Sequence, residues 1–195
     1  MTLDWNSLLT MLNPILSDNM FIVLGRFQPF HNGHAHLLEA ALALGPTTIA
    51  IGSSEAEMSM NNPWDADERA QMIREYLDGR EAKIVQIPDI NDPPNWVEHA
   101  KGFHGDGTLV TSDEETKNLY SESDFPVHWV DYSQRESLEG WRVRLTLKML
   151  STVYEQDGQK QVMLASIPEK VVNWLIDNDA LHRLYSISQG LEHQG

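Results

Sequence analysis

The 195-residue chain contains no cysteine, and that absence excludes disulfide bonds, thiolate metal sites and cysteine nucleophiles. Because nothing in the composition points to an oxidising compartment, we expect a cytoplasmic protein. Basic residues are also scarce: 14 Lys and Arg stand against 29 Asp and Glu, which gives a net charge of −15. The resulting field repels polyanions, so we expect neither nucleic acid nor an acidic membrane surface as a partner.

Long apolar runs are missing as well, since none approaches the roughly 18 residues that cross a bilayer. The first nineteen residues, MTLDWNSLLTMLNPILSDN, contain several leucines but lack a basic start and are interrupted by Asp4 and Pro14. Such a stretch is typical of a docking helix rather than of a signal peptide. We therefore expect an N-terminal extension over 1–19, one domain over 20–188 and a flexible tail over 189–195.

Short apolar runs alternate with helical patterns along the rest of the chain. Five runs are expected to form strands: MFIVLG, TTIAIGSS, AKIVQIP, GTLVTS and VHWVDY. Helical patterns separate them, and Asp65 is suited to cap the helix that follows it. After Tyr132 three stretches have a helical pattern: GWRVRLTLKMLSTVY, IPEKVVNWLIDN and ALHRLYSIS. This alternation predicts an α/β fold: a Rossmann-like open parallel sheet of about five strands, with helices on both faces and a helical C-terminal part.

The segment GRFQPFHNGH, over residues 25–34, carries the strongest functional signal because it joins the first expected strand to a helix. In open parallel sheets the ligand crevice lies at the carboxyl ends of the strands, so we expect His31 and His34 there. Imidazoles beside a helix N-terminus can donate to phosphate oxygens, and Gly33 lets a phosphate approach the backbone. The same histidine spacing also occurs in zinc sites and on exposed helices, but the surrounding strand, glycine and proline favour phosphate binding.

The H-N-G-H sequence resembles the HxGH signature of Rossmann-like nucleotidyltransferases, which class I aminoacyl-tRNA synthetases share. The order of five blocks is similar to that of archaeal-type nicotinamide mononucleotide adenylyltransferases, over roughly residues 20–175. These blocks are GRFQPFHNGH, IGSSEAE, NPWDADER, IPDINDPPNW and LEGWRVR. The resemblance implies transfer of AMP from ATP to nicotinamide mononucleotide, with NAD and pyrophosphate as products.

The resemblance also implies roles for individual residues. The catalytic set is His31, His34, Arg26 and Arg144. The ATP-binding set is Gly25, Arg26, Phe27, Gly33, His34, Gly140 and Arg144, and the acceptor-binding set is Ser53, Asn62, Trp64, Asp89, Asn91 and Trp96. Trp96 matches a position whose indole stacks on the nicotinamide ring, a contact of order 1 to 2 kcal/mol when desolvated. No protein metal ligand is implied, and Mg²⁺ is expected to be bound mainly through the ATP phosphates.

The last block departs from the family pattern ISGTxIR. Glu139 stands where serine is expected, and Trp141 stands where threonine is expected. The matching residues are Gly140, Val143 and Arg144. A carboxylate beside a triphosphate is unfavourable unless a cation lies between them. We therefore expect Glu139 to pair with Arg135 or Arg142, away from the nucleotide.

Several alternatives stay open at this point. HxGH specifies only the nucleotide half of the reaction, so an adenylyl- or cytidylyltransferase with another phosphorylated acceptor is a second interpretation. The replacements at Glu139 and Trp141 also allow a nucleotide-sensing module without turnover. For Arg69, a ligand role and a structural role, paired with Asp65 or Glu68, are equally compatible with the sequence. The resemblance further implies a homo-oligomer, and it does not separate nicotinamide from nicotinate mononucleotide.

Overall fold

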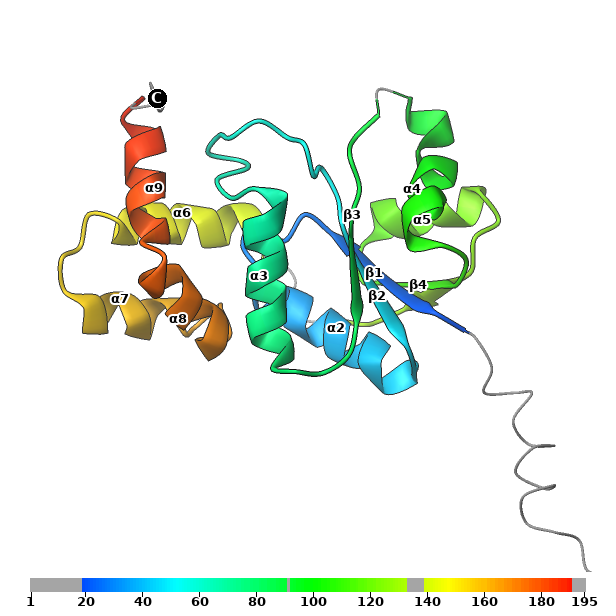
Figure 1. Cartoon of the computed structure of the whole chain (residues 1–195), viewed down its shortest axis with the longest axis horizontal. Coiled ribbons are helices and arrows are strands. Elements are labelled where there is room, and N and C mark those ends of the chain that lie inside the picture. The colour runs from blue at the N-terminus through cyan, green and yellow to red at the C-terminus, as the bar shows by residue number, and fades with distance from the viewer. Residues whose placement is uncertain (1–18, 91, 133–138, 191–195) are drawn as a thin grey trace, which may run out of the picture.

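A computed structural model describes residues 19–90, 92–132 and 139–190. Five strands in this part of the chain form one parallel sheet with the order β3-β2-β1-β4-β5 (Figure 1). The strands are β1 (Phe21–Gly25), β2 (Thr47–Ile51), β3 (Lys83–Gln86), β4 (Thr108–Thr111) and β5 (Val127–Trp129). The predicted α/β architecture with about five parallel strands is confirmed.

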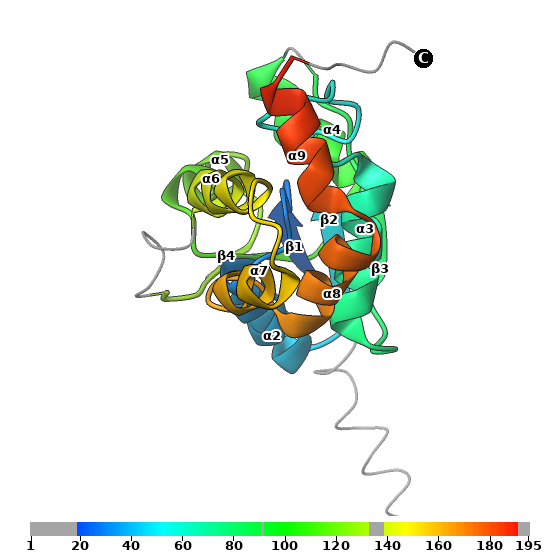
Figure 2. The same ribbon diagram turned by 90° about the vertical axis from the view of Figure 1, so that its left-hand side faces the viewer.

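Helices cover both faces of this sheet. They are α2 (Asn32–Leu44), α3 (Ala66–Leu77), α4 (Trp96–His104), α5 (Glu114–Glu122), α6 (Gly140–Leu150), α7 (Gln156–Met163), α8 (Glu169–Asp177) and α9 (Ala180–Ser188), and the short 3-10 helix η2 (Pro93–Asn95) precedes α4. Helices α2 and α3 share one hydrophobic cluster with the C-terminal helices, whereas α4 and α5 share a second cluster with the opposite face. Figure 1 shows α6 to α9 on the left and α4 on the right of the sheet, and Figure 2, viewed from that left side, shows α7 and α8 in front of the strands.

Strand β2 shows why the expected strands are almost continuously apolar. All five of its residues are buried. Ile49 and Ile51 belong to the cluster with α2 and α3, while Ala50 between them belongs to the cluster with α4 and α5. Because successive side chains of a strand point to opposite faces, a strand covered on both faces has no exposed position, and even Thr47 and Thr48 of β2 are buried.

Helix boundaries follow local capping signals where the sequence provides them. The Asp65 side chain accepts from the Glu68 N–H at 2.9 Å, and the Glu68 carboxylate accepts from the Asp65 N–H at 3.0 Å, so the predicted cap of α3 is confirmed. Helix α7 is not among the helices predicted from the sequence. Its sequence, QDGQKQVM, has little apolar periodicity, and its start depends on Glu155, whose carboxylate accepts from the N–H groups of Asp157 and Gly158.

The strand order reverses at β1, because the chain moves outward through β2 and β3 before it returns to β4 and β5 on the other side. In such sheets the ligand crevice lies at the carboxyl ends of the strands beside this reversal. The helices in the described ranges include none that is long and apolar enough to cross a membrane. The predicted extension and tail lie almost wholly outside those ranges, as do Asn91 and Arg135.

Candidate active site

A cavity of about 330 Å³ opens at the carboxyl ends of β1 and β4, where the strand order reverses. Its walls come from the end of β1, the start of α2, the end of β4, the start of α5 and the start of α6. The lining residues are Leu24, Gly25, His31, Gly33, His34, Leu37, Thr111, Ser112, Asp113, Thr116, Tyr132, Glu139 and Gly140. The structure therefore brings together both predicted histidines and the three glycines of the predicted ATP-binding set.

A larger groove of about 700 Å³ lies at the opposite edge of the sheet. Met20, Thr47 and Lys83 line it, and these residues lie at or beside the amino-terminal ends of β1, β2 and β3. None of the predicted site residues that the structure describes is part of its walls. Because ligands of open parallel sheets bind at the carboxyl edge, the smaller cavity is the candidate site.

The two histidines cap helix α2 reciprocally. His31 Nδ1 accepts from the Gly33 N–H at 3.1 Å, and His34 Nδ1 accepts from the His31 N–H at 3.3 Å. A neutral imidazole has one donor and one acceptor nitrogen, so each ring carries its proton on Nε2. The rings also stack, with their centroids 3.7 Å apart. The capping of α2 therefore holds both imidazoles in one orientation and one tautomer.

Both rings are uncharged at neutral pH. Burial, together with the positive charge of Arg144, lowers the pKa of His31 to about 4. Burial and the neighbouring His31 also lower the pKa of His34 well below its ordinary value, although a hydrogen bond with the Pro29 backbone raises it in part. The site therefore presents neutral N–H donors, and an anionic ligand beside them would raise both pKa values again.

The N-termini of α2 and α6 approach each other across the cavity. A methyl group at Gly140, the first residue of α6, would lie 3.3 Å from Arg144 Nη1 and 3.9 Å from His31 Nε2. A methyl group at Gly33 would lie 3.0 Å from the His31 ring. Two helix N-termini add their free N–H groups and positive dipole ends to the same site. The arrangement suits an anion, and the two glycines leave space for it.

Two arginines supply the positive charge of this region. Arg144 is buried, and its Nη1 donates to the Gln28 carbonyl at 2.8 Å. Arg26 is exposed; burial and, to a smaller extent, the positive charge of Arg26 lower the pKa of both Arg69 and Arg144. Phe27 does not line the cavity: its buried ring packs against His34, with the centroids 4.7 Å apart. It supports the histidine from the core side.

Glu139 is paired, as expected from the sequence. Its Oε2 accepts from the Trp141 indole N–H at 2.6 Å and from Arg142 Nε at 3.3 Å. The Arg142 guanidinium also lies over the Trp141 ring, 4.7 Å from its centroid. Both residues that depart from the family pattern thus belong to one surface cluster with Arg142, although Glu139 also contributes to the cavity wall.

This pairing predicts that Glu139→Ser leaves ATP affinity within about twofold of the wild type, because Arg142 already offsets the carboxylate. Calorimetric titration of ATP into both proteins at low and high salt measures the effect. A gain in affinity that shrinks as salt rises would show instead that the carboxylate acts on the phosphates. Glu114→Ser is the matched control, because it removes another exposed carboxylate that pairs with a cation three positions away.

Among the described residues, the predicted acceptor set does not line the 330 Å³ cavity. Asn62 and Trp64 lie in the loop 52–65 between β2 and α3. Each has a buried polar atom, Asn62 Oδ1 and Trp64 Nε1, without a hydrogen-bond partner in the described part of the chain. Buried polar atoms usually have partners, so water or a ligand is expected at this loop.

The other predicted acceptor residues lie along the same edge of the sheet. Ser53 follows β2 with a φ of 49°, in the left-handed region. Asp89 is exposed after β3; burial lowers the pKa of Arg69, and the charges of Asp65 and Asp89 offset part of that shift. Trp96 begins α4; it is half-buried and meets Tyr120 edge-on, with the centroids 6.2 Å apart. Part of the indole is therefore accessible.

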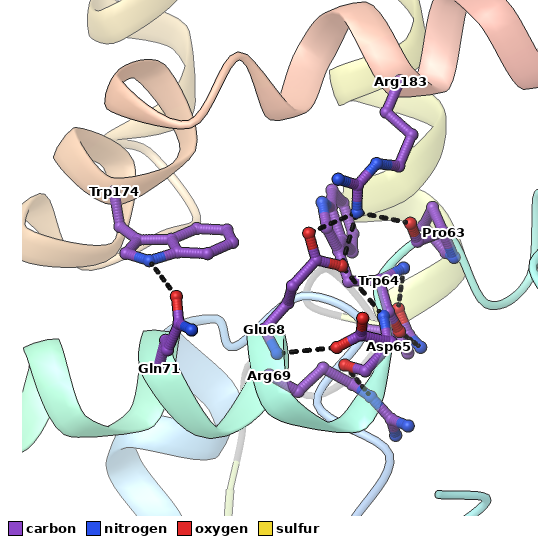
Figure 3. Close-up of polar contacts among 9 residues, drawn as sticks. Pro63, Trp64, Asp65, Glu68, Arg69, Gln71, Trp174 and Arg183 are labelled. Carbon is purple, nitrogen blue, oxygen red and sulfur yellow. Dashed lines mark hydrogen bonds and ion pairs between the residues drawn. The ribbon is translucent and has the colours of Figure 1, made fainter. Parts of the chain in front are cut away.

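Arg69 is buried and bonds main-chain carbonyls, as a residue with a structural role does. It is 1% exposed, and its Nη1 donates to the carbonyls of Arg26 and Gly52, each at 2.9 Å. Its Nη2 donates to the Ser53 carbonyl and its Nε to the Asp65 carbonyl, each at 3.0 Å. The sequence left pairing with Asp65 or Glu68 open. The Asp65 contact goes to the main chain, and Glu68 binds Arg183 instead (Figure 3).

Several cavity residues were not predicted from the sequence. Thr111 ends β4, and Ser112, Asp113 and Thr116 follow it. Tyr132 also lines the cavity, and its ring stacks on His36 with centroids 4.6 Å apart. Their position in the sequence is the signal that could have identified the residues at the end of β4, because polar residues that follow a parallel strand lie at the ligand edge of the sheet. The same rule predicted the site residues that follow the first two strands.

Comparisons with known proteins show the family. The Cytidylyltransferase-like family profile matches residues 22–101. The nicotinamide-nucleotide adenylyltransferase of Picrophilus torridus is 32% identical over 175 residues, which cover 87% of this chain and 98% of the relative. That of Methanocorpusculum labreanum is 30% identical over 172 residues, with 86% and 96% covered. The chain belongs to the nicotinamide-nucleotide adenylyltransferase family. The family resemblance identified from the five sequence blocks is thereby confirmed.

A solved structure shows the same fold. It is a bifunctional NMN adenylyltransferase/ADP ribose pyrophosphatase from Francisella tularensis, in complex with AMP and a manganese ion. The TM-score is 0.60 at 18% identity, and the match covers 89% of this chain and 53% of that one. This chain therefore spans about half of the bifunctional protein.

Proposed function

We propose that this chain transfers AMP from ATP to nicotinamide mononucleotide and releases pyrophosphate. The observation that carries the proposal is the cavity at which two helix N-termini, the His31 ring and the Arg144 guanidinium converge. This site offers neutral and charged N–H donors to a polyphosphate, in a protein whose net charge is −15. The positive potential is therefore local. The chain also matches 96% and 98% of the lengths of two nicotinamide-nucleotide adenylyltransferases, which supports the same reaction.

In this reaction a phosphate oxygen of the mononucleotide attacks the α-phosphorus of ATP in line. The new phosphorus–oxygen bond forms as the bond to the bridging oxygen of the β-phosphate breaks, and that oxygen leaves with pyrophosphate. The attacking phosphate is already ionised, so no general base is needed. Catalysis comes from positioning the two substrates and from stabilising charge in the transition state.

Residues at different positions around the cavity bind different phosphates of the substrate. The helix N-termini at Gly33 and Gly140 bind phosphate oxygens through main-chain N–H groups. Arg144 and Arg26 hold the β- and γ-phosphates, while the Nε2–H groups of His31 and His34 donate to the α- and β-phosphates. His34 already bonds the Pro29 backbone, so it shares or exchanges that bond when the phosphate is present.

The divalent ion enters with ATP as part of the substrate. In the parts of the chain that the structure describes, no three His, Asp or Glu side chains lie together as a metal site. Mg²⁺ commonly keeps several waters and is bound through substrate phosphates. We propose this arrangement here, with the protein's cations and helix N-termini sharing the phosphate charge with the ion.

The Trp96 side chain provides the acceptor-side prediction. Replacing Trp96 with alanine should raise the acceptor KM several-fold and leave the ATP KM nearly unchanged, because the indole would stack only on the pyridine ring. Steady-state kinetics with each substrate varied in turn measures both values. Phe103→Ala, which removes a partly exposed ring from the same helix, should change neither value. An equal loss for both substrates would instead assign Trp96 to the core beside Tyr120.

A substrate panel tests the function itself. Purified protein is given ATP or CTP with nicotinamide mononucleotide, nicotinate mononucleotide, phosphopantetheine or a sugar phosphate, and pyrophosphate release and product are measured. The proposal expects pyrophosphate and NAD in equal amounts from ATP and nicotinamide mononucleotide. Turnover confined to another acceptor would contradict it. Binding of ATP without turnover on any acceptor would favour the nucleotide-sensing alternative.

A further inference from the structure

Gln28 lies in the turn between β1 and α2, and it is 2% exposed. Its side-chain amide bonds both main-chain groups of Trp64. Nε2 donates to the Trp64 carbonyl at 2.6 Å, and Oε1 accepts from the Trp64 N–H at 3.2 Å. Both bonds are buried, and they join residues 36 positions apart. The Gln28 amide thus satisfies both main-chain hydrogen-bonding groups of Trp64, as a neighbouring strand would.

The main chain of Gln28 contacts the other side of the site. Its carbonyl accepts from Arg144 Nη1 at 2.8 Å in a buried bond. Arg144 is the buried cation beside Gly140 and His31, at the phosphate end of the crevice. One residue therefore connects the arginine of the phosphate end with the loop that contains the predicted acceptor residues.

The loop at Trp64 depends on such external bonds, because it forms neither helix nor strand between β2 and α3. On its other side, Arg183 of α9 donates to the Pro63 carbonyl at 3.4 Å and forms an ion pair with Glu68 (Figure 3). The buried atoms without a hydrogen-bond partner, Asn62 Oδ1 and Trp64 Nε1, flank Pro63. The loop is thus held at its main chain by Gln28 on one side and by Arg183 on the other, and the Trp64 side chain between them is 1% exposed.

We propose that Gln28 is a positioning residue that sets the acceptor side of the crevice relative to the triphosphate side. This inference rests on the proposed function, because it takes the loop 52–65 as part of the acceptor site. Gln28 is 2% exposed and does not line the 330 Å³ cavity. It acts through two bonds to Trp64 and one bond to Arg144, and rigid support of this kind determines whether reacting groups meet at the correct distance.

Gln28 bonds Trp64 through its side chain and Arg144 through its main chain, and this difference distinguishes a positioning role from a general role in stability. A substitution at position 28 removes the two side-chain bonds to Trp64 and keeps the main-chain carbonyl that binds Arg144. The acceptor side should therefore be affected and the ATP side spared. A residue that only stabilised the fold would change both substrates alike or neither.

The test compares Gln28→Met with the wild type. Methionine has nearly the same length and volume but provides no amide, and Gln28→Asn keeps an amide that is too short to reach both groups of Trp64. Gln71→Met is the matched control, because Gln71 also bonds a tryptophan, accepting from the Trp174 indole at 3.3 Å, on α3 and away from the crevice (Figure 3). ATP and nicotinamide mononucleotide are varied in turn, and thermal unfolding is recorded for each protein.

We expect Gln28→Met to raise the KM for nicotinamide mononucleotide about five- to tenfold, the effect of losing one to two buried hydrogen bonds. The KM for ATP should stay within about twofold, Gln28→Asn should show a smaller shift in the same direction, and Gln71→Met should show none. If Gln28→Met does not fold, the KM values of Gln28→Asn for nicotinamide mononucleotide and for ATP are compared instead. Equal shifts for both substrates, or a lowered unfolding temperature with unchanged KM values, would overturn the proposal. An inactive wild type would contradict the proposed function instead.

Discussion

Replacing His34 with alanine is expected to lower kcat by at least about two orders of magnitude, with a smaller effect on the acceptor KM. The His34 ring is held by its Nδ1 bond to the His31 N–H and by stacking on His31 at 3.7 Å. Its Nε2–H is therefore oriented before substrates bind, and a preoriented donor acts on the charge that develops in the transition state. Pyrophosphate release at saturating ATP and nicotinamide mononucleotide measures the change.

The matched control is His182→Ala, because His182 is exposed on α9 and lies outside the cavity. It should retain wild-type kcat. The His34 variant also loses one capping bond of α2, so thermal unfolding is measured beside the kinetics to show that the protein is folded under the assay conditions. A folded His34→Ala protein with near-wild-type kcat would remove the HxGH sequence from the mechanism.

Replacing Arg69 with methionine is expected to lower the free energy of unfolding by about 3 to 5 kcal/mol. The guanidinium bonds four carbonyls, at Arg26, Gly52, Ser53 and Asp65, and it is almost completely buried. Methionine would fill much of the volume but would leave those carbonyls without a donor, and unpaired buried polar groups are costly. Urea unfolding followed by circular dichroism measures the loss.

Arg80→Met serves as the comparison. Arg80 also bonds a carboxylate and two carbonyls, but its contacts with Glu39 are exposed, so its loss should cost no more than about 1 kcal/mol. A similarly small loss for Arg69→Met, together with a large rise in the ATP KM, would reverse the assignment and make Arg69 a ligand. The two variants therefore separate the roles that the sequence left open.

Local patterns were sufficient for most of the fold because several independent signals agreed. In β2 the β-branched and apolar sequence TTIAI agreed with burial on both faces, and at α3 the Asp65 and Glu68 pair agreed with the start of the amphipathic pattern. Helix α7 lacked such agreement: it is polar, contains Gly158 and begins at a glutamate cap. Its packing through Met163 depends on neighbouring elements that no local window contains.

The sequence by itself determined the α/β class, the parallel strands and the position of the HxGH segment at the start of a helix, because apolar period, capping residues and turn residues act over a few positions. It also located the charged side chains near the phosphate end. Tertiary structure alone decided which long-range partners these side chains have. It turned Arg69 toward four carbonyls, brought Thr116 and Tyr132 into the cavity, and joined Gln28 to Trp64 and Arg144. Such contacts form between segments separated by tens to more than a hundred residues, so they depend on how the helices and strands pack rather than on any local pattern.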